Sequence, residues 1–229
     1  MTNFKPRQMS YTIKILSITP VTHDVRCIRL GKPARYSFIP GQATDVAINR
    51  NGWRDQQRPF TFTCLNSDHY LEFTIKSYTD HDGVTNQIST LDVGDELIIG
   101  DPWGAIRYTG EGYFIAGGAG ITPFIAIFRQ LHQVGLIGKN KLFFSNKTPA
   151  DIIYKSELRK IFNDNVVFVL TREGQEHNEI DFIDKDFLAA HANKLDNSFY
   201  VCGPDLMVQK INEILIELGV QPQSVVFEK

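Results

Sequence analysis

The sequence predicts two domains, an antiparallel β-barrel followed by an α/β domain with a doubly wound parallel sheet. Up to about residue 108, short runs alternate between apolar and polar residues and are separated by turn signals, which is typical of half-buried strands. Beyond residue 112, strand-like runs alternate with segments of helical period, which indicates a parallel sheet covered by helices on both faces. We expect the domains to comprise residues 1–110 and 111–229.

The first domain is expected to contain six strands, at residues 11–18, 25–30, 43–48, 58–64, 70–78 and 96–100. One segment, 84–91, has apolar spacing that suits a short helix at an end of the barrel. Six strands joined by turns, with hardly any other helical periodicity, predict a small six-stranded barrel of the Greek-key type.

The second domain is expected to begin with the strand 113–116. The residues Gly117, Gly118 and Gly120 then permit a sharp turn, and Thr122-Pro123 suits a helix N-terminus. A strand, a glycine turn and a helix start direct unpaired N–H groups at one point, where a phosphate can bind. The alternative is an ordinary tight turn, since the third glycine of the usual dinucleotide fingerprint is absent. Further strands are expected at 141–145, 166–171 and 198–202, and helices at 123–134, 156–162, 184–192 and 205–218.

Composition narrows the class of protein. Of the 229 residues, 42% are apolar and 22% charged, which is enough to form a globular core, and the net charge of −2 offers no bulk attraction to nucleic acid or anionic membranes. No signal peptide or membrane-spanning run is recognisable, so we expect a cytoplasmic protein. Three isolated cysteines and six histidines without metal-ligand spacing predict no metal site.

The stretch 58–63, with the sequence Arg-Pro-Phe-Thr-Phe-Thr, is the most informative part of the first domain. A bend at Pro59 would let Arg58 reach an anion while Phe60 stacks on a ring and Thr61 donates a hydrogen bond. The alternative is a surface arginine before a half-buried strand. Residues 82–86 open the expected helix and offer N–H groups and the Thr85 hydroxyl to a second anion, unless they only cap the helix.

Together these motifs resemble the ferredoxin–NADP reductase superfamily of flavin reductases, over essentially all of residues 10–229. The resemblance is carried by residues 58–63, by Gly-Val-Thr-Asn at 83–86, by the glycine loop 117–123 and by Cys-Gly-Pro-Asp at 202–205, in the family's order and near its separations.

The resemblance implies that the first domain holds FAD. Arg58 would neutralise the pyrophosphate together with Thr85 and the 83–86 backbone. Phe60, where the family more often has tyrosine, would stack on the isoalloxazine, and Thr61 would hydrogen-bond near flavin N5. The remaining implied contacts to FAD are Pro59, Thr63, Thr74, Ile75, Lys76, Tyr78, Gly83 and Val84.

The resemblance also implies that the second domain delivers a nicotinamide. Cys202 would lie near nicotinamide C4, although a buried cysteine at a strand end is also an ordinary core residue. Glu228 matches a C-terminal glutamate of the family and, with Thr61 and Cys202, completes the expected catalytic residues. The chain stops at Lys229, where the family has an aromatic residue, so Phe227 would take its place. The implied nucleotide contacts are Gly118, Gly120, Thr122, Pro123, Gly203 and Asp205.

The choice between NADP and NAD depends on residues further along. An acidic residue after the second strand would favour NAD, but this chain has Asn146 and Lys147 there. Thr171-Arg172 resembles the Ser/Thr-Arg pair that holds the 2′-phosphate in NADP-using members, because guanidinium pairs bidentately with phosphate. The alternative is a surface arginine. We expect NADP.

The predicted function is that of an FAD-dependent oxidoreductase that passes hydride from NAD(P)H to FAD, and then electrons to a separate carrier such as flavodoxin or ferredoxin. Such carriers are acidic, and five arginines would provide a basic docking face unless they are ordinary solvated residues: Arg26, Arg29, Arg35, Arg50 and Arg54. The alternatives are reduction of free flavin, ferric complexes or quinone, and a non-enzymatic module that keeps only the fold.

Overall fold

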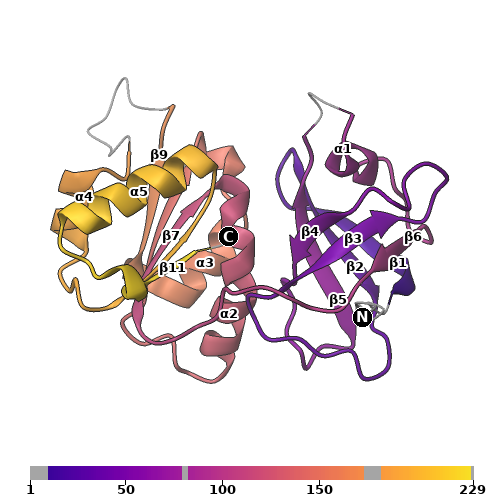
Figure 1. The fold of residues 1–229 in the computed structure, drawn as a ribbon, viewed down its shortest axis with the longest axis horizontal. Coiled ribbons are helices and arrows are strands. Elements are labelled where there is room, and N and C mark those ends of the chain that lie inside the picture. The colour runs from indigo at the N-terminus through magenta and orange to yellow at the C-terminus, as the bar shows by residue number, and fades with distance from the viewer. Residues whose placement is uncertain (1–9, 79–81, 173–181, 228–229) are drawn as a thin grey trace, which may run out of the picture.

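A computed structural model of the chain describes residues 10–78, 82–172 and 182–227. Its first half is the predicted antiparallel barrel, whose six strands lie in the order β4-β3-β6-β1-β2-β5 (Figure 1). Alternating side chains from these strands, among them Ile13, Ile28 and Leu97, fill the interior. The elements are β1 (Tyr11–Pro20), β2 (Val25–Gly31), β3 (Ala43–Ile48), β4 (Arg58–Thr61), β5 (Tyr70–Lys76), α1 (Val84–Ile88) and β6 (Glu96–Ile99).

The barrel is nearly closed, and its seam lies between β4 and β5. These strands stand at the two ends of the sheet order. Just beyond β4, a bridge between Phe62 and Phe73 and a backbone hydrogen bond from Thr63 N to Glu72 O connect the chain to β5. β4 is therefore shorter than predicted, because the chain turns from pairing with β3 toward β5 after Thr61. Both strands of the seam belong to the motifs that the sequence singled out for FAD.

The second half is a parallel sheet with the strand order β11-β10-β7-β8-β9. Its strands are β7 (Gly112–Gly117), β8 (Lys141–Asn146), β9 (Val166–Leu170), β10 (Ser198–Cys202) and the unexpected edge strand β11 (Val225–Phe227). Its helices are α2 (Thr122–Gln133), α3 (Lys155–Phe162), α4 (Lys185–His191) and α5 (Asp205–Glu217), with single 3₁₀ turns at Gly118–Ile121, Pro149–Asp151, Asn163–Asn165 and Pro222–Ser224.

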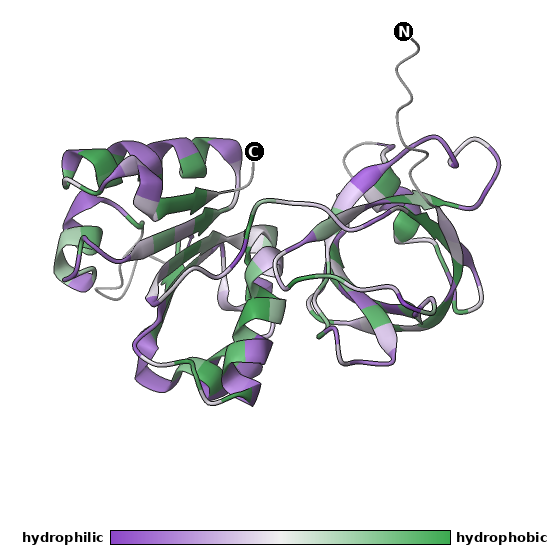
Figure 2. Ribbon diagram, turned by 60° about the horizontal axis from the view of Figure 1, so that its bottom comes forward, coloured by the Kyte–Doolittle hydropathy of each residue, from purple (hydrophilic) through white to green (hydrophobic). Residues whose placement is uncertain are grey.

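Alternate residues of the buried strands explain the two helical layers. Phe114 and Phe144 face the cluster that contains the apolar residues of α2 and α3, whereas Tyr113 and Phe143 face the cluster with α4 and α5. Because both faces of the strands are covered, the strands are largely apolar, as the green of the central sheet shows in Figure 2. The predicted fold class, a barrel followed by a doubly wound sheet, is confirmed.

The segment between the last barrel strand and β7 is bound to both halves. Trp103 pairs with Ala43 of the barrel, and Ile106 joins the core cluster of the second domain, in which Val25 of the barrel also takes part. The Tyr200 hydroxyl accepts hydrogen bonds from the backbone N–H groups of Thr109 and Gly110 and donates one to Gly110 O. The expected division at 110/111 falls within this segment and stays a prediction.

Candidate functional site

A cavity of about 650 Å³ lies at the carboxyl ends of β7, β8 and β10, where the strand order of the parallel sheet reverses. In open α/β sheets this switch point is where ligands bind. Two barrel residues at the end of β5 and just beyond it, Lys76 and Tyr78, complete the wall. Of the predicted site residues, the cavity brings together Lys76, Tyr78, Gly118, Gly120, Thr122, Pro123, Lys147, Thr171, Cys202 and Gly203.

The glycine loop packs directly on the end of β10. A Cβ on Gly120 would lie 2.4 Å from the carbonyl oxygen of Cys202, so no larger residue fits there without a shift of backbone. Gly118 has φ of +51°, the left-handed region that glycine adopts without strain. The Thr122 hydroxyl donates to Ala119 O at 2.9 Å and closes the turn at the start of α2. The loop therefore exposes its backbone to the cavity, as the phosphate-binding interpretation expects.

Cys202 ends β10 beside Ala116 of β7 and is 7% exposed. It is one of the residues that line the cavity. Pro204 and Met207 at the start of α5 extend this wall. Asp205, the first residue of α5, is exposed and is absent from the described lining, so the structure gives it no contact with the cavity.

The other two cysteines are core residues. Burial raises the pKa of the Cys64 thiol to about 12. Burial together with the nearby Glu72 charge raises that of Cys27 to about 11. Both therefore remain protonated thiols near neutral pH and are unsuited to act as nucleophiles.

The residues predicted to choose between NADP and NAD divide into two groups. Lys147 is exposed and lines the cavity, and so does Thr171, whose hydroxyl lies 3.4 Å from Asn146 O. Arg172 is exposed, is absent from the described lining, and donates its backbone N–H to Lys147 O. The backbone of Arg172 is thus held next to that of Lys147.

Asn146 is a cavity residue that the sequence interpretation noted only for not being acidic. It is 5% exposed, and its Oδ1 is buried without a hydrogen-bond partner. Buried amide oxygens are normally satisfied, so an orphan at a ligand cavity calls for an explanation. Ser145 of β8 lines the cavity too. The sequence contained a signal for Ser145 and Asn146, because both lie at the end of a predicted parallel strand, next to the glycine loop.

The residues predicted for the flavin lie on the barrel seam. Arg58 is exposed at the start of β4, and its guanidinium donates to Gln57 O. Phe60 is half-buried and tilted against Phe73, with the ring centroids 6.4 Å apart. Thr61 ends β4 and is 8% exposed. Pro59 is exposed between them. Figure 1 shows β4 on the side of the barrel that faces the second domain.

The side chains of four other predicted FAD contacts point inward, and their assignment to FAD stays a prediction. The Thr63 hydroxyl contacts Glu72 Oε1 at 3.0 Å and Thr74 Oγ1 at 3.1 Å, inside the protein. Ile75 and Val84 belong to the barrel core. The register of a strand or helix decides which side chains face inward, and these four would meet a ligand through their backbone. All four have low exposure: Thr63 0%, Thr74 5%, Ile75 2% and Val84 2%.

The helix expected to clamp a pyrophosphate is shorter than predicted. α1 spans only five residues and begins after Gly83, with Thr85 half-buried. Five residues are too few to build a substantial macrodipole, so an anion there would depend on individual N–H groups and on Thr85. Glu228, the third expected catalytic residue, lies outside the described residues, as does the side chain of Phe227.

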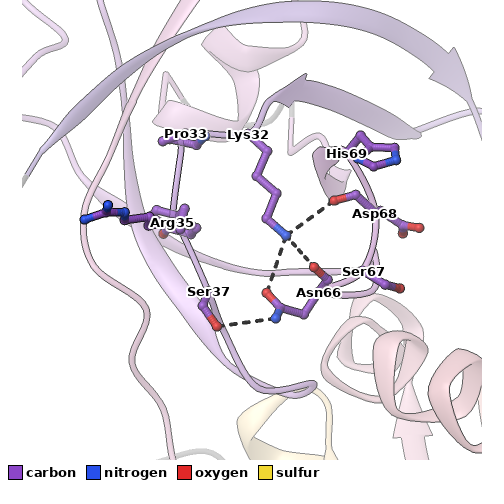
Figure 3. Close-up of a pocket in the computed structure, with 9 residues that line it drawn as sticks. Lys32, Pro33, Arg35, Ser37, Asn66, Ser67, Asp68 and His69 are labelled. Carbon is purple, nitrogen blue, oxygen red and sulfur yellow. Dashed lines mark hydrogen bonds between the residues drawn. The ribbon is translucent and has the colours of Figure 1, made fainter.

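Of the five arginines expected to form a basic face, two are paired with carboxylates and two bond to neutral oxygens, and the face stays a prediction. Arg29 Nε lies 2.9 Å from the Glu72 carboxylate, and Arg50 lies 2.7 Å from Asp95. Arg26 donates to Ser89 O, and Arg54 donates to Asn49. Arg35 lies apart from them, beside a shallow hollow on the barrel (Figure 3).

That hollow, of about 390 Å³, contains none of the predicted site residues. Its polar groups bond to one another: Lys32 donates to the carbonyl oxygens of Asn66 and Asp68, and the Asn66 amide donates to Ser37 (Figure 3). A further group that the sequence did not predict, His23, Asp24 and Asp151, brings potential metal-ligand atoms within 4.8 Å of one another. The Asp24 carboxylate is already paired with Lys76 and the Asp151 carboxylate caps a 3₁₀ turn.

Comparisons with known proteins agree with this arrangement. A family profile described as "Oxidoreductase NAD-binding domain" matches residues 114–213. The reductase component of propane 2-monooxygenase from Rhodococcus jostii (strain RHA1) is 25% identical, over 94% of this chain and 62% of its own. NADH-cytochrome b5 reductase 1 from Neosartorya fischeri is 28% identical, over 88% of this chain and 72% of its own.

The fold is shared with solved structures. A ferredoxin NADP⁺ reductase from Neisseria gonorrhoeae, solved with bound FAD and NADP, superposes with a TM-score of 0.81 at 18% identity, covering 97% of this chain and 99% of its own. The chain spans only 60 to 66% of the length of three curated relatives that it matches, two propane monooxygenase reductases and a naphthalene dioxygenase reductase. In the described residues, no helix is both long and apolar enough to cross a membrane.

The seam of the barrel, the glycine loop at the switch point and the Cys-Gly turn beside it thus occur together with an NAD-binding domain profile and the two-domain fold. Residues 114–213 thus match an oxidoreductase NAD-binding domain, and the chain as a whole has the two-domain fold of the ferredoxin NADP⁺ reductase structure.

Proposed function

We propose that the chain is an FAD-dependent oxidoreductase that takes reducing equivalents from NAD(P)H, with NADPH favoured, and passes electrons to a separate carrier protein such as a flavodoxin or ferredoxin. The observation that carries the proposal is the composition of the 650 Å³ cavity, in which Lys76 and Tyr78 of the barrel meet the glycine loop and Cys202 of the NAD-binding domain. A nucleotide bound in this cavity would lie next to the end of β5, one of the two strands at the barrel seam.

The residues present suit the two cofactors. The close approach of Gly120 to Cys202 leaves backbone N–H groups at the cavity, and the unpartnered Asn146 Oδ1 is suited to accept a hydrogen bond on rearrangement of the wall. On the barrel, the exposed Arg58 and the half-buried Phe60 lie along a strand with an open edge, which leaves backbone groups for a planar ligand. We assign Arg58 to the pyrophosphate and Phe60 and Thr61 to the isoalloxazine ring.

When bound, the two cofactors supply the redox chemistry, hydride transfer between nicotinamide and flavin; the protein supplies binding and orientation. In this proposal Cys202 and the glycine loop hold the nicotinamide end, and Thr61 donates a hydrogen bond at the flavin. Lys147 is the residue that supports NADPH most directly, because it is a cationic residue of the cavity lining and the 2′-phosphate of NADPH is anionic.

An anaerobic titration tests the proposal. The protein is reconstituted with FAD, and its flavin absorbance is followed on addition of NADPH and, separately, of NADH. We expect both nucleotides to bleach the flavin, NADPH at lower concentrations than NADH. A protein that binds no FAD, or whose bound FAD is not reduced, would exclude the proposed function.

The ion pairs of Arg29 and Arg50 favour a second class of electron acceptor, small molecules in place of a carrier protein. Arg29 and Arg50, two of the five arginines expected to dock an acidic carrier, are paired with Glu72 and Asp95, which reduces the positive charge available to such a carrier. Reduction of free flavin, ferric complexes or quinone is the alternative. Steady-state rates with flavodoxin, ferredoxin and free FMN separate the two, since comparable turnover of FMN without saturation by either protein favours the alternative.

A further inference from the structure

A buried polar bridge joins the NAD-binding domain to the barrel, and no predicted function accounts for it. We define the bridge as Thr63, Glu72 and Thr74 of the barrel with Arg129 and Tyr154 of the NAD-binding domain. Arg129 Nη1 donates to Glu72 Oε1 at 2.7 Å and to Thr63 O at 2.6 Å. The other side of the guanidinium is held in its own domain by Glu157, at 2.6 and 2.9 Å.

Tyr154 forms the second half of the bridge. Its hydroxyl lies 2.9 Å from Thr74 Oγ1, which in turn lies 3.1 Å from Thr63 Oγ1. The Arg129 guanidinium stacks over the Tyr154 ring, 5.0 Å from its centroid. Tyr154 has φ of +54°, a left-handed conformation that is strained for a tyrosine and persists only where the surroundings impose it.

Because this network is buried, it tolerates little change in the relative position of its groups. The Glu72 side chain is 2% exposed and that of Arg129 is 22% exposed. A buried charge is tolerated only while its partner and hydrogen bonds remain in place. A shift of one domain against the other would separate Glu72 from Arg129, so the pair accepts essentially one relative placement of α2 and β5.

The elements that carry the bridge also carry the proposed cofactor sites. Arg129 lies seven residues after Thr122 on α2, about two turns or 10 Å along a straight helix. Thr63 follows Thr61 by two residues, and Thr74 precedes Lys76 by two. Each end of the bridge is therefore connected by a short rigid element to the cavity or to the seam.

We propose that Arg129 and Tyr154 are positioning residues that hold the nucleotide cavity in register with the barrel seam, so that the nicotinamide and the flavin meet at reacting distance. Hydride transfer requires the reacting atoms about 3–3.5 Å apart, and a misplacement of about 1 Å costs up to 100-fold in rate. This inference rests on the proposed function, because it assigns the bridge a role in that reaction.

Tyr154→Phe is the first test. It removes only the hydroxyl, and Thr74 keeps its contact with Thr63. Tyr113→Phe is the matched control, because the buried Tyr113 hydroxyl bonds Asn193 and Lys194 within the NAD-binding domain alone. In stopped-flow reduction of the FAD-loaded protein, we expect Tyr154→Phe to lower the limiting rate at saturating NADPH roughly tenfold. The dissociation constant for NADPH and the retention of FAD should change less than about twofold, and Tyr113→Phe should match the wild type.

Three outcomes would overturn the inference. These are a limiting rate for Tyr154→Phe within about twofold of the wild type, an equal loss in Tyr113→Phe, and a change confined to the dissociation constant. The last would mean that Tyr154 contributes to binding and not to positioning.

A second measurement needs neither cofactor nor activity. Calorimetry of the FAD-free protein compares the wild type with the double variant Glu72→Gln/Arg129→Met, which removes the ion pair between the domains; Arg29 and Glu157, which also lose a partner, are half-exposed and can be solvated. We expect one cooperative unfolding transition in the wild type and two in the variant, one for each domain. A single transition in both proteins would show that the bridge does not couple the domains. If the wild type fails to bind or reduce FAD, the proposed function is excluded, while calorimetry still decides whether the bridge couples the domains.

Discussion

Arg129 and Glu72, 57 residues apart in the chain, form a 2.7 Å ion pair that bonds helix α2 to the barrel strand β5. Burial alone would raise the pKa of the Glu72 carboxyl. The charge of Arg129 and hydrogen bonds from Arg129, Arg29 and Thr63 together bring it below its ordinary value of 4.5. The carboxylate is thus ionised over the whole neutral range, although almost no water reaches it.

This pKa predicts how stability depends on acidity. A carboxyl whose pKa is lower in the folded state stabilises the protein above its unfolded pKa, and that contribution is lost as the pH falls through the folded value. We therefore expect the free energy of unfolding to decrease as the pH is lowered from 4.5. Glu72→Gln should make this decrease less steep and should lower the free energy of unfolding at neutral pH. Urea unfolding at a series of pH values measures both. The control is Glu217→Gln at an exposed ion pair with Lys185, which should keep the wild-type acid slope; the same slope in Glu72→Gln would contradict the assignment.

Gly120→Ala should be disruptive. The added methyl carbon would lie 2.4 Å from Cys202 O and 2.5 Å from Gly203 N, both backbone atoms that cannot rotate away. We expect a loss of about 1–3 kcal/mol in stability together with weakened binding of NADPH, measured by thermal unfolding and by titration. Gly94→Ala is the control: its φ is +96° but no atom lies within 4 Å of the new Cβ, so it should cost stability through the backbone and leave NADPH binding intact. Unchanged binding in Gly120→Ala would exclude the loop from the nucleotide site.

Arg58→Ala should weaken the retention of FAD. A hydrogen bond to a charged group contributes about 1.5–3 kcal/mol, which corresponds to roughly a ten- to hundredfold rise in the dissociation constant. Fluorescence titration of the FAD-free protein measures it. Arg54→Ala, another exposed arginine on the preceding loop, should bind FAD like the wild type. A variant at residue 58 that stays fully yellow through dialysis would show that Arg58 does not clamp the pyrophosphate.

Lys147→Ala and Arg172→Ala should raise the KM for NADPH far more than that for NADH, because only NADPH carries the 2′-phosphate. The effect should be larger at Lys147, which lines the cavity, than at Arg172, which is absent from its lining. Lys160→Ala, at an exposed position on α3, serves as the control. Equal changes in the two KM values would remove the case for NADP.

The sequence predicted most elements because their signals are local. Alternation identified the barrel strands, and the glycine turn followed by Pro123 marked the start of α2 within one residue of its observed position. β11 was missed because three residues are too few to show a period; it exists only through its pairing with β10.

The prediction of the site was weakest where tertiary register decides. The RPFTFT motif identified Thr63 as a cofactor contact, but the turn of the chain toward β5 places its hydroxyl on Glu72. Arg29 appeared to be a surface charge because Glu72, its partner, is 43 residues away. Asn146 has no local signal apart from its place at a strand end, since the orphan oxygen appears only once the strand is packed.

The connection between the domains has a mechanical consequence. Trp103 is paired with the barrel, and Ile106 belongs to the second core while its backbone lies against Gly41 of the barrel. The Tyr200 hydroxyl bonds the backbone of Thr109 and Gly110. A segment bonded at such short intervals is a rigid linker and not a flexible one. Proteases should cut it slowly despite its lack of regular structure, and a fragment beginning at residue 111 would leave Tyr200 with a buried ring and no bonding partners from that segment.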